Sequence, residues 1–167
     1  GSLATVGPPP GYSDESLTTV NIIGGTVGDA TGIKHQYGGN VYGSGRGEIA
    51  APGLTLDRMA TVKQAVVNIG AKDGSTLSGD GLVNASVYGS GENGHVNANA
   101  TINIYGGNIG DHSNTAAQAN EYCGNVFGAG SGTDTYKDSN NVDRYNPVAG
   151  IVKGNTTINV EGGWVIS

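Results

Sequence analysis

The feature that most constrains this chain is a phrase that recurs along it: a TVNI-like run, a Gly-Gly pair and, further on, GNVYGSG. Faithful copies begin at Thr19 and Thr101, a less faithful copy begins at Val66, and a last copy begins at Thr157 and stops at Ser167. Repeats of this kind form stacked units, in which each unit buries its apolar face against its neighbours. The repeat therefore predicts a stacked architecture before any propensity is considered.

Short β-branched runs bounded by Gly, Asn, Asp and Ser recur throughout the chain, whereas helical periodicity is hard to find. Each unit contains a run that leads into the Asn-containing strand, the VNI strand itself, and a stretch from xVG to NVYG. Three short strands joined at glycine corners predict an all-β fold, a parallel β-helix (solenoid) with three strands per coil. The general preference of parallel crossovers predicts a right-handed helix. Corner glycines are expected to supply positive φ and to leave room for close packing.

The chain divides into a leader and one repeat segment, with no sign of two globular cores. Residues 1–16 hold Gly1-Ser2, which is typical of a cloning remnant, and a Pro/Gly linker at residues 8–11. Residues 17–167 hold the repeats and stop in mid-repeat, so we interpret them as truncated at the C-terminal end and the natural protein as longer at both ends. Insertions after xVG and after GSG are expected to leave the stack at its corners; they span residues 29–37, 46–60, 111–122 and 131–149.

Composition excludes several classes of protein. Glycine accounts for 31 residues, but there are only 5 prolines and no G-X-Y period, which excludes collagen. A net charge of -6 with only 13% charged residues argues against a nucleic-acid partner. Cys123 is the only cysteine, so it can form no internal disulfide and is expected to be a small apolar filler. No stretch reaches the roughly 18 apolar residues of a membrane span, so direct membrane insertion is not expected.

Alternation divides the side chains of the VNI strands between two faces. The core face is expected to hold Val20, Ile22, Val67, Ile69, Ile102, Ile104, Ile158 and Val160. The other face is expected to stack Asn21, Asn68, Asn103 and Asn159. The favoured interpretation is an asparagine ladder with amide bonds from strand to strand, because such ladders recur where identical strands stack. A role in reading a ligand is the alternative.

Aromatic residues recur at one repeat position, as Tyr42, Tyr88 and Phe127. If the preceding valines face the core, the aromatic rings form an exposed ladder; if the strand is bulged at Gly, the rings are the core. Phe127 has no hydroxyl group that needs contact with water, which favours packing of the three rings on one another over stacking on a sugar. Loops carry most binding residues. The better candidates for contact with a glycan or a protein are therefore the insertion tyrosines Tyr37, Tyr122, Tyr136 and Tyr145.

Patterns for catalysis or metal binding are weak. Glycosidic cleavage needs paired carboxylates on one face, whereas the acids here lie almost entirely outside the periodic strands. Asp29 and Asp111 occupy matching positions and are interpreted as turn or capping residues. The segment from Asp138 to Asp143 offers alternating oxygens but lacks the central Gly and closing Glu of an EF-hand, so calcium is the less favoured interpretation. The histidines are expected to be solvated loop residues; they are His35, His95 and His112. The sequence predicts no catalytic residue, no metal site and no cofactor.

The phrase TVNIxGGxVG followed by GNVYGSG resembles the Gly-rich repeats of large secreted or surface-anchored, adhesin-like proteins of gut-type bacteria. The resemblance covers most of residues 17–167 outside the insertions. The second unit departs from it, with Gly70-Ala71-Lys72 in place of the Gly-Gly turn and Ser86 in place of Asn. The resemblance implies a parallel β-helix and an extracellular location at the bacterial cell surface, and it carries no catalytic residues.

We therefore expect a non-catalytic segment of an adhesin-like or structural surface protein that presents insertion loops. The alternatives are a glycan-active domain, lyase or hydrolase-like, a glycan-binding β-helix domain, and a purely architectural spacer. The expected partners are neighbouring repeats of the same chain and, if the loops bind anything, a host glycan or surface protein; nucleic acid is not expected.

Overall fold

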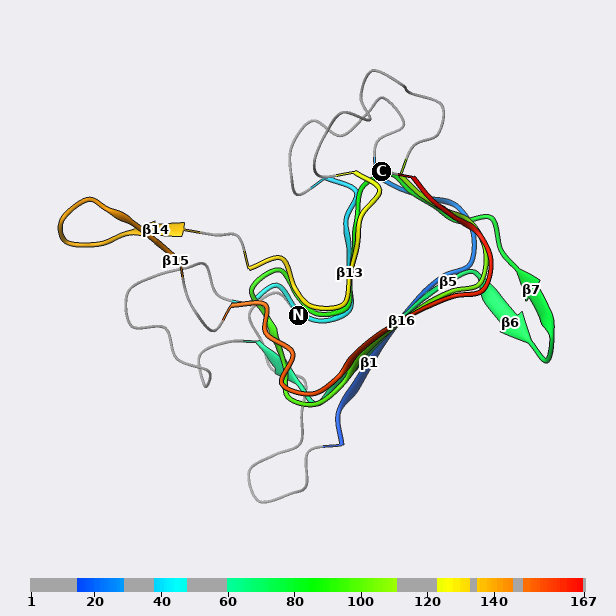
Figure 1. Ribbon diagram of the computed structural model, residues 1–167, viewed down its shortest axis with the longest axis horizontal. Helices are drawn as coiled ribbons and strands as arrows, with labels where there is room; N and C mark the ends of the chain where they lie inside the picture. The colour runs from blue at the N-terminus through cyan, green and yellow to red at the C-terminus, as the bar shows by residue number, and fades with distance from the viewer. Residues whose placement is uncertain are drawn as a thin grey trace.

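A computed structural model describes residues 15–28, 38–47, 60–110, 123–132, 135–145 and 149–166. Within these ranges all the regular structure is β, and the sheets are mostly parallel. Viewed down the short axis of the molecule, equivalent strands of successive repeats lie over one another (Figure 1). The described residues therefore form an all-β protein whose repeats stack strand on strand.

Sheet A contains the VNI strands. Its order is β1 (Leu17–Ile22), β5 (Gln64–Ile69), β11 (Ala100–Ile104) and β16 (Thr156–Val160). The pairing is parallel and in register, so that Asn103 lies between Asn68 and Asn159, and Asn21 follows Asn68. Because the strand order follows the chain, each repeat adds one strand to the sheet.

The remaining parallel strands form three further groups. Sheet B has the order β2 (Thr26–Val27), β8 (Leu82–Val83), β12 (Asn108–Ile109) and β17 (Trp164–Val165). Sheet C has the order β3 (Val41–Tyr42), β9 (Val87–Tyr88) and β13 (Val126–Phe127). The run that leads into sheet A pairs β4 (Thr61–Val62) with β10 (His95–Val96), and a bridge from Val96 to Val152 extends this pairing into the last repeat.

The expectation of three strands per repeat is wrong in one respect, because the xVG-to-NVYG stretch is divided between sheets B and C. Gly28 and Gly110 follow the strands of sheet B with φ of 98° and 90°. That left-handed conformation turns the chain before the next strand begins. The repeats therefore contribute to four strand positions.

Two antiparallel hairpins project from the stack on different sides (Figure 1). One joins β6 (Ala71–Asp73) to β7 (Thr76–Ser78), at the bend between sheets A and B in the second repeat. The other joins β14 (Thr135–Lys137) to β15 (Asp143–Tyr145), beyond sheet C in the third repeat. The second hairpin lies in an insertion that the sequence predicts, whereas the first occupies a corner where no insertion was expected.

The core lies between the sheets and confirms the predicted faces for the central repeats. Val67, Ile69, Ile102 and Ile104 are fully buried, together with residues of sheets B and C. On β1, Val20 and Ile22 are partly buried and pack against this cluster. On β16, however, Ile158 is 42% and Val160 is 60% exposed. Their predicted burial is wrong because no further strand of the described residues covers the outer edge of β16.

The bend between sheets A and B depends on glycine. The second residue of each Gly-Gly pair has positive φ, as expected, with values of 78°, 77° and 77° at Gly25, Gly107 and Gly163. A Cβ on Gly107 would lie only 2.3 Å from the carbonyl oxygen of Gly81 in the preceding repeat. Successive repeats therefore approach so closely at this bend that a side chain has no room.

Candidate binding surface

The hairpin β6–β7 belongs to the second repeat but contacts the third and fourth. Lys72 Nζ lies 2.5 Å from Glu161 Oε2 and 5.9 Å from the centre of the Tyr105 ring. Leu77 covers the next bend, because a Cβ on Gly162 would lie 3.2 Å from Leu77 Cδ1. The hydrogen bond to Glu161 raises the pKa of Lys72, which keeps its ammonium group charged. The hairpin thus leans along the stack over the bend.

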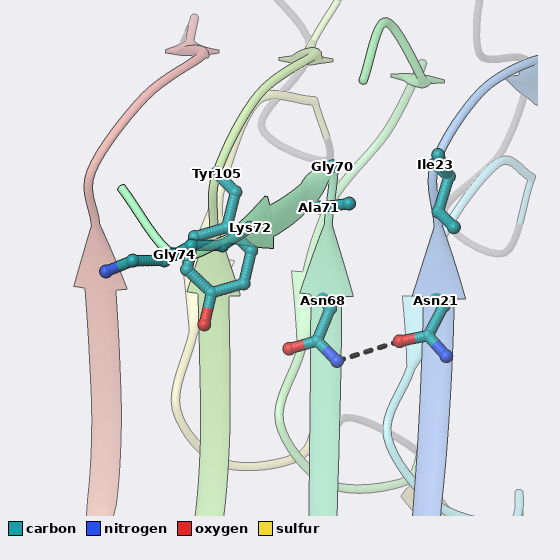
Figure 2. Close-up of a pocket in the computed structure, with 8 residues that line it drawn as sticks. All are labelled: Asn21, Ile23, Asn68, Gly70, Ala71, Lys72, Gly74 and Tyr105. Atoms are coloured by element: carbon teal, nitrogen blue, oxygen red, sulfur yellow. Dashed lines mark hydrogen bonds between the residues drawn. The ribbon is translucent and has the colours of Figure 1, made fainter. Parts of the chain in front are cut away.

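On the side of sheet A, the hairpin borders a hollow of about 510 Å³. Its lining includes Asn21 and Asn68 of the outer face of sheet A, Lys72 of the hairpin, and Tyr105. Figure 2 shows the two asparagines side by side on neighbouring strands, with Lys72 and Tyr105 close together beside them. The hollow therefore combines amide groups, one ammonium group and one aromatic ring.

On the side of sheet B, the same hairpin borders a second hollow of about 380 Å³. Its lining includes Leu77 of the hairpin, Asp80, Tyr105, Asn108 and Trp164, with glycines from three repeats between them. Asn108 and Trp164 occupy paired positions on neighbouring strands, so their side chains share the outer face of sheet B. Trp164 is 68% exposed. Tyr105 lines both hollows, which makes it the residue they share.

The outer face of sheet A carries a row of hydrogen-bonded asparagine side chains. Asn68 Nδ2 donates to Asn21 Oδ1 at 2.7 Å, Asn103 Nδ2 donates to Asn68 Oδ1 at 2.8 Å, and Asn159 Nδ2 donates to Asn103 Oδ1 at 2.8 Å. Each inner member uses one N–H group and one lone pair in the row. The second N–H group of each amide is directed elsewhere, and the first hollow includes two members of this row.

The repeated aromatic residues stack on one another along sheet C. Tyr42 and Tyr88 have ring centroids 4.9 Å apart, and Tyr88 and Phe127 have centroids 5.0 Å apart, with interplanar angles of 16° and 18°. The preceding Val41 and Val87 are buried, so the rings lie on the outer side of the strands. Partial burial raises the pKa of Tyr88. Because the rings cover one another's faces, the geometry is that of packing.

The four insertion tyrosines do not form one surface within the described residues. Tyr37 and Tyr122 lie outside those residues. Tyr136 is half-buried and pairs with Arg144, whereas Tyr145 is 67% exposed and pairs with Thr135. Since neighbouring positions on a strand point to opposite faces, the two tyrosines lie on opposite sides of the hairpin β14–β15.

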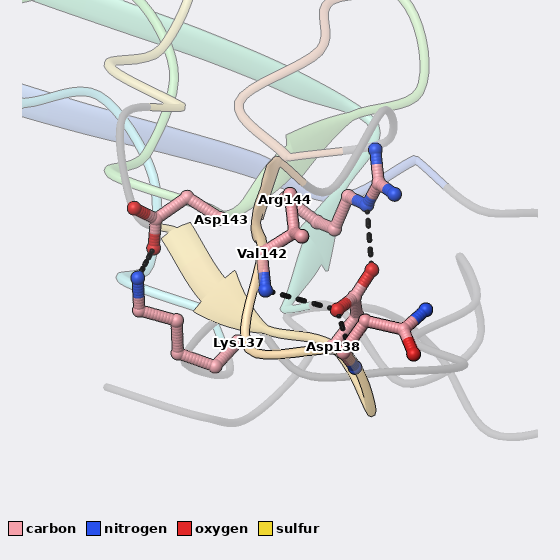
Figure 3. Close-up of polar contacts among 6 residues, drawn as sticks. Lys137, Asp138, Val142, Asp143 and Arg144 are labelled. Carbon is pink, nitrogen blue, oxygen red and sulfur yellow. Dashed lines mark hydrogen bonds and ion pairs between the residues drawn. The ribbon is translucent and has the colours of Figure 1, made fainter.

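The oxygen-rich loop at the tip of β14–β15 uses its carboxylates within the hairpin (Figure 3). Asp138 Oδ1 accepts from the backbone N–H groups of Asn140 and Val142 at 2.8 and 3.0 Å, and Arg144 Nε donates to Asp138 Oδ2 at 2.9 Å. The backbone bond from Val142, then the bond from Arg144, lower the pKa of Asp138. Asp143 pairs with Lys137 at 2.8 Å. The carboxylates whose spacing suggested calcium ligands thus form hydrogen bonds and ion pairs within the hairpin.

Among the buried polar residues near the GSG corner, two are titratable, His95 and Glu92. His95 is fully buried, so its expectation as a solvated loop residue is wrong; it lies on β10, and that strand is covered on both sides. Burial and the charge of Lys153 lower the pKa of His95, while the side chain of Asn97 opposes this shift. Glu92 is also buried and pairs with Arg46 at 3.1 Å. Among the described residues no group of three or more His, Cys, Asp or Glu side chains is placed to hold a metal ion.

Some predicted positions lie outside the described residues: Asp29, Asp111, His35 and His112. Cys123 is in no disulfide and is buried beside the third GNVFG segment, as a filler would be. Of the residues that line the second hollow, the sequence singled out only the corner glycines and none of the larger side chains. The hairpin β6–β7 could have been predicted from the sequence, because Gly74-Ser75 between Asp73 and Thr76 is typical of a two-residue hairpin turn. Gly74 has φ of 57°.

The fold and this surface define a class: an all-β repeat protein with mostly parallel, in-register sheets. Comparison with known proteins adds no family to that class, since no family model, curated protein or solved structure matches the chain. In the described part of the chain, none of the elements is a helix with the length and apolar character needed to cross a membrane.

Proposed function

We propose that this chain is a segment of a right-handed parallel β-helix in an extracellular, adhesin-like or structural protein of the bacterial surface. The observation that carries the proposal is the in-register stacking of equivalent strands in chain order, with hairpins leaving at the bends. A stack of this kind tolerates sequence change in whatever leaves its corners. It is therefore suited to presenting variable surfaces on a constant support.

A non-catalytic role is supported by the engagement of carboxylates within the described residues. Five of them are held by cations in ion pairs: Glu15 with Lys63, Arg46 with Glu92, Lys72 with Glu161, Lys137 with Asp143, and Asp138 with Arg144. Acid and base catalysis of glycosidic cleavage requires two carboxyl groups facing one bond of the substrate. The paired carboxylates instead fasten hairpins and corners to their surroundings.

The proposal is tested by presenting the purified fragment to an array of host and plant glycans and of host surface proteins. In parallel, the same polysaccharides are assayed for new reducing ends and unsaturated products. We expect saturable binding to at least one array member and no turnover. Turnover that disappears in Asp29→Ala or Asp111→Ala would overturn the non-catalytic assignment, and an array without any binding would favour a spacer.

A further inference from the structure

We propose that the bend between sheets A and B carries a binding site for a neutral oligosaccharide, centred on Tyr105 and Trp164. The inference rests on the proposed function, because it names the ligand class and the residues through which such a surface segment would bind. It moves the site from the insertion tyrosines to residues of the repeats themselves. The surface consists of the two hollows that border the hairpin β6–β7.

The shape of the second hollow follows from the packing of the repeats. Its floor is glycine because the backbones approach too closely for side chains: a Cβ on Gly106 would lie 2.7 Å from Gly79 O, and one on Gly163 would lie 2.6 Å from Gly107 O. Leu77 of the hairpin borders the hollow and reaches over Gly162 of the fourth repeat. The depression is therefore a consequence of the tight bend, and a ligand there meets backbone groups as well as side chains.

The chemistry of the lining matches the two kinds of surface that a sugar ring presents. The flat apolar face of a sugar packs on an aromatic ring, and Trp164 offers a largely exposed indole in the hollow that Tyr105 also lines. The hydroxyl groups of a sugar both donate and accept, and they meet the amide of Asn108 and the exposed carboxylate of Asp80. A few polar groups among apolar and aromatic ones are typical of small-ligand sites.

The charges favour a neutral ligand over an anionic one. Lys72, the cation that lines the first hollow, is engaged by Glu161 at 2.5 Å. Asp80 adds a negative charge on the other side of the hairpin. A sulfated or phosphorylated glycan would have to disrupt the ion pair and approach a carboxylate of like charge. A neutral chain of sugars meets neither cost.

The position of Tyr105 allows a ligand longer than one sugar. Because Tyr105 lines both hollows, a chain that packs on its ring can extend from Trp164 toward the asparagine row of sheet A. Asn68 donates one side-chain N–H group to Asn21 Oδ1, and its amide has a second N–H group that this bond does not use. The amides of the row thus add donors along the direction in which the repeats stack.

Trp164 makes the site directly measurable because it is the only tryptophan in the chain. The intact fragment is titrated with neutral cello-, chito-, manno- and galacto-oligosaccharides to about 10 mM while tryptophan emission is recorded. Asp80→Asn and Tyr105→Ala are titrated beside it, and Tyr145→Ala serves as a matched control that removes an exposed tyrosine elsewhere. Circular dichroism verifies that each variant is folded, and Asp80→Asn, which is nearly isosteric, keeps the test valid if Tyr105→Ala unfolds.

We expect a saturable change with at least one neutral oligosaccharide, at least about tenfold weaker in Asp80→Asn and Tyr105→Ala and unchanged in Tyr145→Ala. No saturable change, an equal response in all variants, or a response only to sulfated glycans or peptides would overturn the proposal. Binding to the array distinguishes failure of this site from failure of the proposed function. If the fragment binds the array but Asp80→Asn binds equally well, this site is wrong and the proposed function stands; if the intact fragment binds nothing, this site fails and only the structural spacer role of the proposed function remains.

Discussion

The parallel stack and the hairpin β14–β15 are held together in opposite ways. In the stack, equivalent residues of different repeats lie side by side, so that buried Ile102 of the third repeat pairs in register with Val67 of the second. In the hairpin, the contacts stay within residues 135–145, and they are ion pairs and backbone bonds of exposed groups. The free energy of the stack therefore comes from burial between repeats, whereas the hairpin carries its own local order.

This difference shows where sequence can vary at low cost. A change in an inner strand of the stack, such as β5 or β11, acts on two neighbouring repeats at once, because that strand lies between two others. A change in β14–β15 acts only on the hairpin. Stability and surface identity are thus assigned to different parts of the chain, and substitutions can test that separation.

The largest effect is expected from Ile104→Ala. The side chain is fully buried between the neighbouring strands, so its truncation leaves a cavity and should lower the free energy of unfolding by about 2 to 5 kcal/mol. Val160→Ala is the matched control, because Val160 pairs with Ile104 in register but is 60% exposed, and it should cost less than about 1 kcal/mol. Urea denaturation measures both. Equal losses would show that burial between repeats does not determine the cost.

A smaller loss is expected where backbones of neighbouring repeats touch. A Cβ on Gly91 would lie 1.9 Å from Gly45 O, so Gly91→Ala forces the first two repeats apart and should cost about 1 to 3 kcal/mol. Gly24→Ala is the control, since its Cβ would meet only the tip of the Asp80 side chain at 3.1 Å. Neither glycine has a left-handed φ. Thermal melting that ranks the two variants alike would contradict the close approach.

The asparagine row should contribute less per residue. Asn103→Ala removes one donated and one accepted bond on a half-buried face and should cost about 1 to 2 kcal/mol. Asn159→Ala removes only one bond and should cost about half as much. Chemical denaturation of both variants gives the ratio. If Asn159→Ala lowers the free energy of unfolding as much as Asn103→Ala does, the hydrogen bonds between the asparagine side chains do not account for the loss.

The stack should also lose stability in mild acid through His95. Its pKa is lowered in the folded protein, so below the ordinary value of about 6.5 the unfolded chain binds a proton that the native protein excludes. The free energy of unfolding should therefore fall as the pH drops below that value, until the folded pKa is passed. His95→Gln removes this contribution, and its denaturation profile should be flatter over the same window. An unchanged slope in the variant would assign the pH dependence to other groups.

The sequence predicted the elements that repeat and missed those that depend on one repeat alone. Alternation placed Ile102 and Ile104 in the core because neighbouring side chains of any strand point to opposite faces. It could not show that Ile158 is exposed, since exposure there depends on what covers β16. Tyr105 and Trp164 lie at bend positions that other residue types occupy in other repeats, so the repeat pattern did not identify them as binding residues. They line one hollow only because the third and fourth repeats stack and the hairpin β6–β7 borders the same bend.

The smallest effect on stability is expected from removing the hairpins. Replacing residues 133–146, which include β14–β15, by a Gly-Ser link should change the free energy of unfolding by no more than about 0.5 kcal/mol, because loop-closure entropy varies slowly with length and the lost ion pairs are exposed. Replacing residues 71–78 by a Gly-Gly turn removes the exposed Lys72–Glu161 pair and should lower the free energy of unfolding only slightly, because water screens exposed ion pairs.

Binding distinguishes the two deletions although stability does not. Both hollows lose a wall when residues 71–78 are removed, so the oligosaccharide response of Trp164 should be lost in that variant and retained in the other. Thermal melting and tryptophan titration of the pair measure the two effects separately. A deletion of residues 133–146 that unfolds the chain would show that β14–β15 belongs to the stack after all. Retention of the response without residues 71–78 would show that the bend binds sugar without its hairpin.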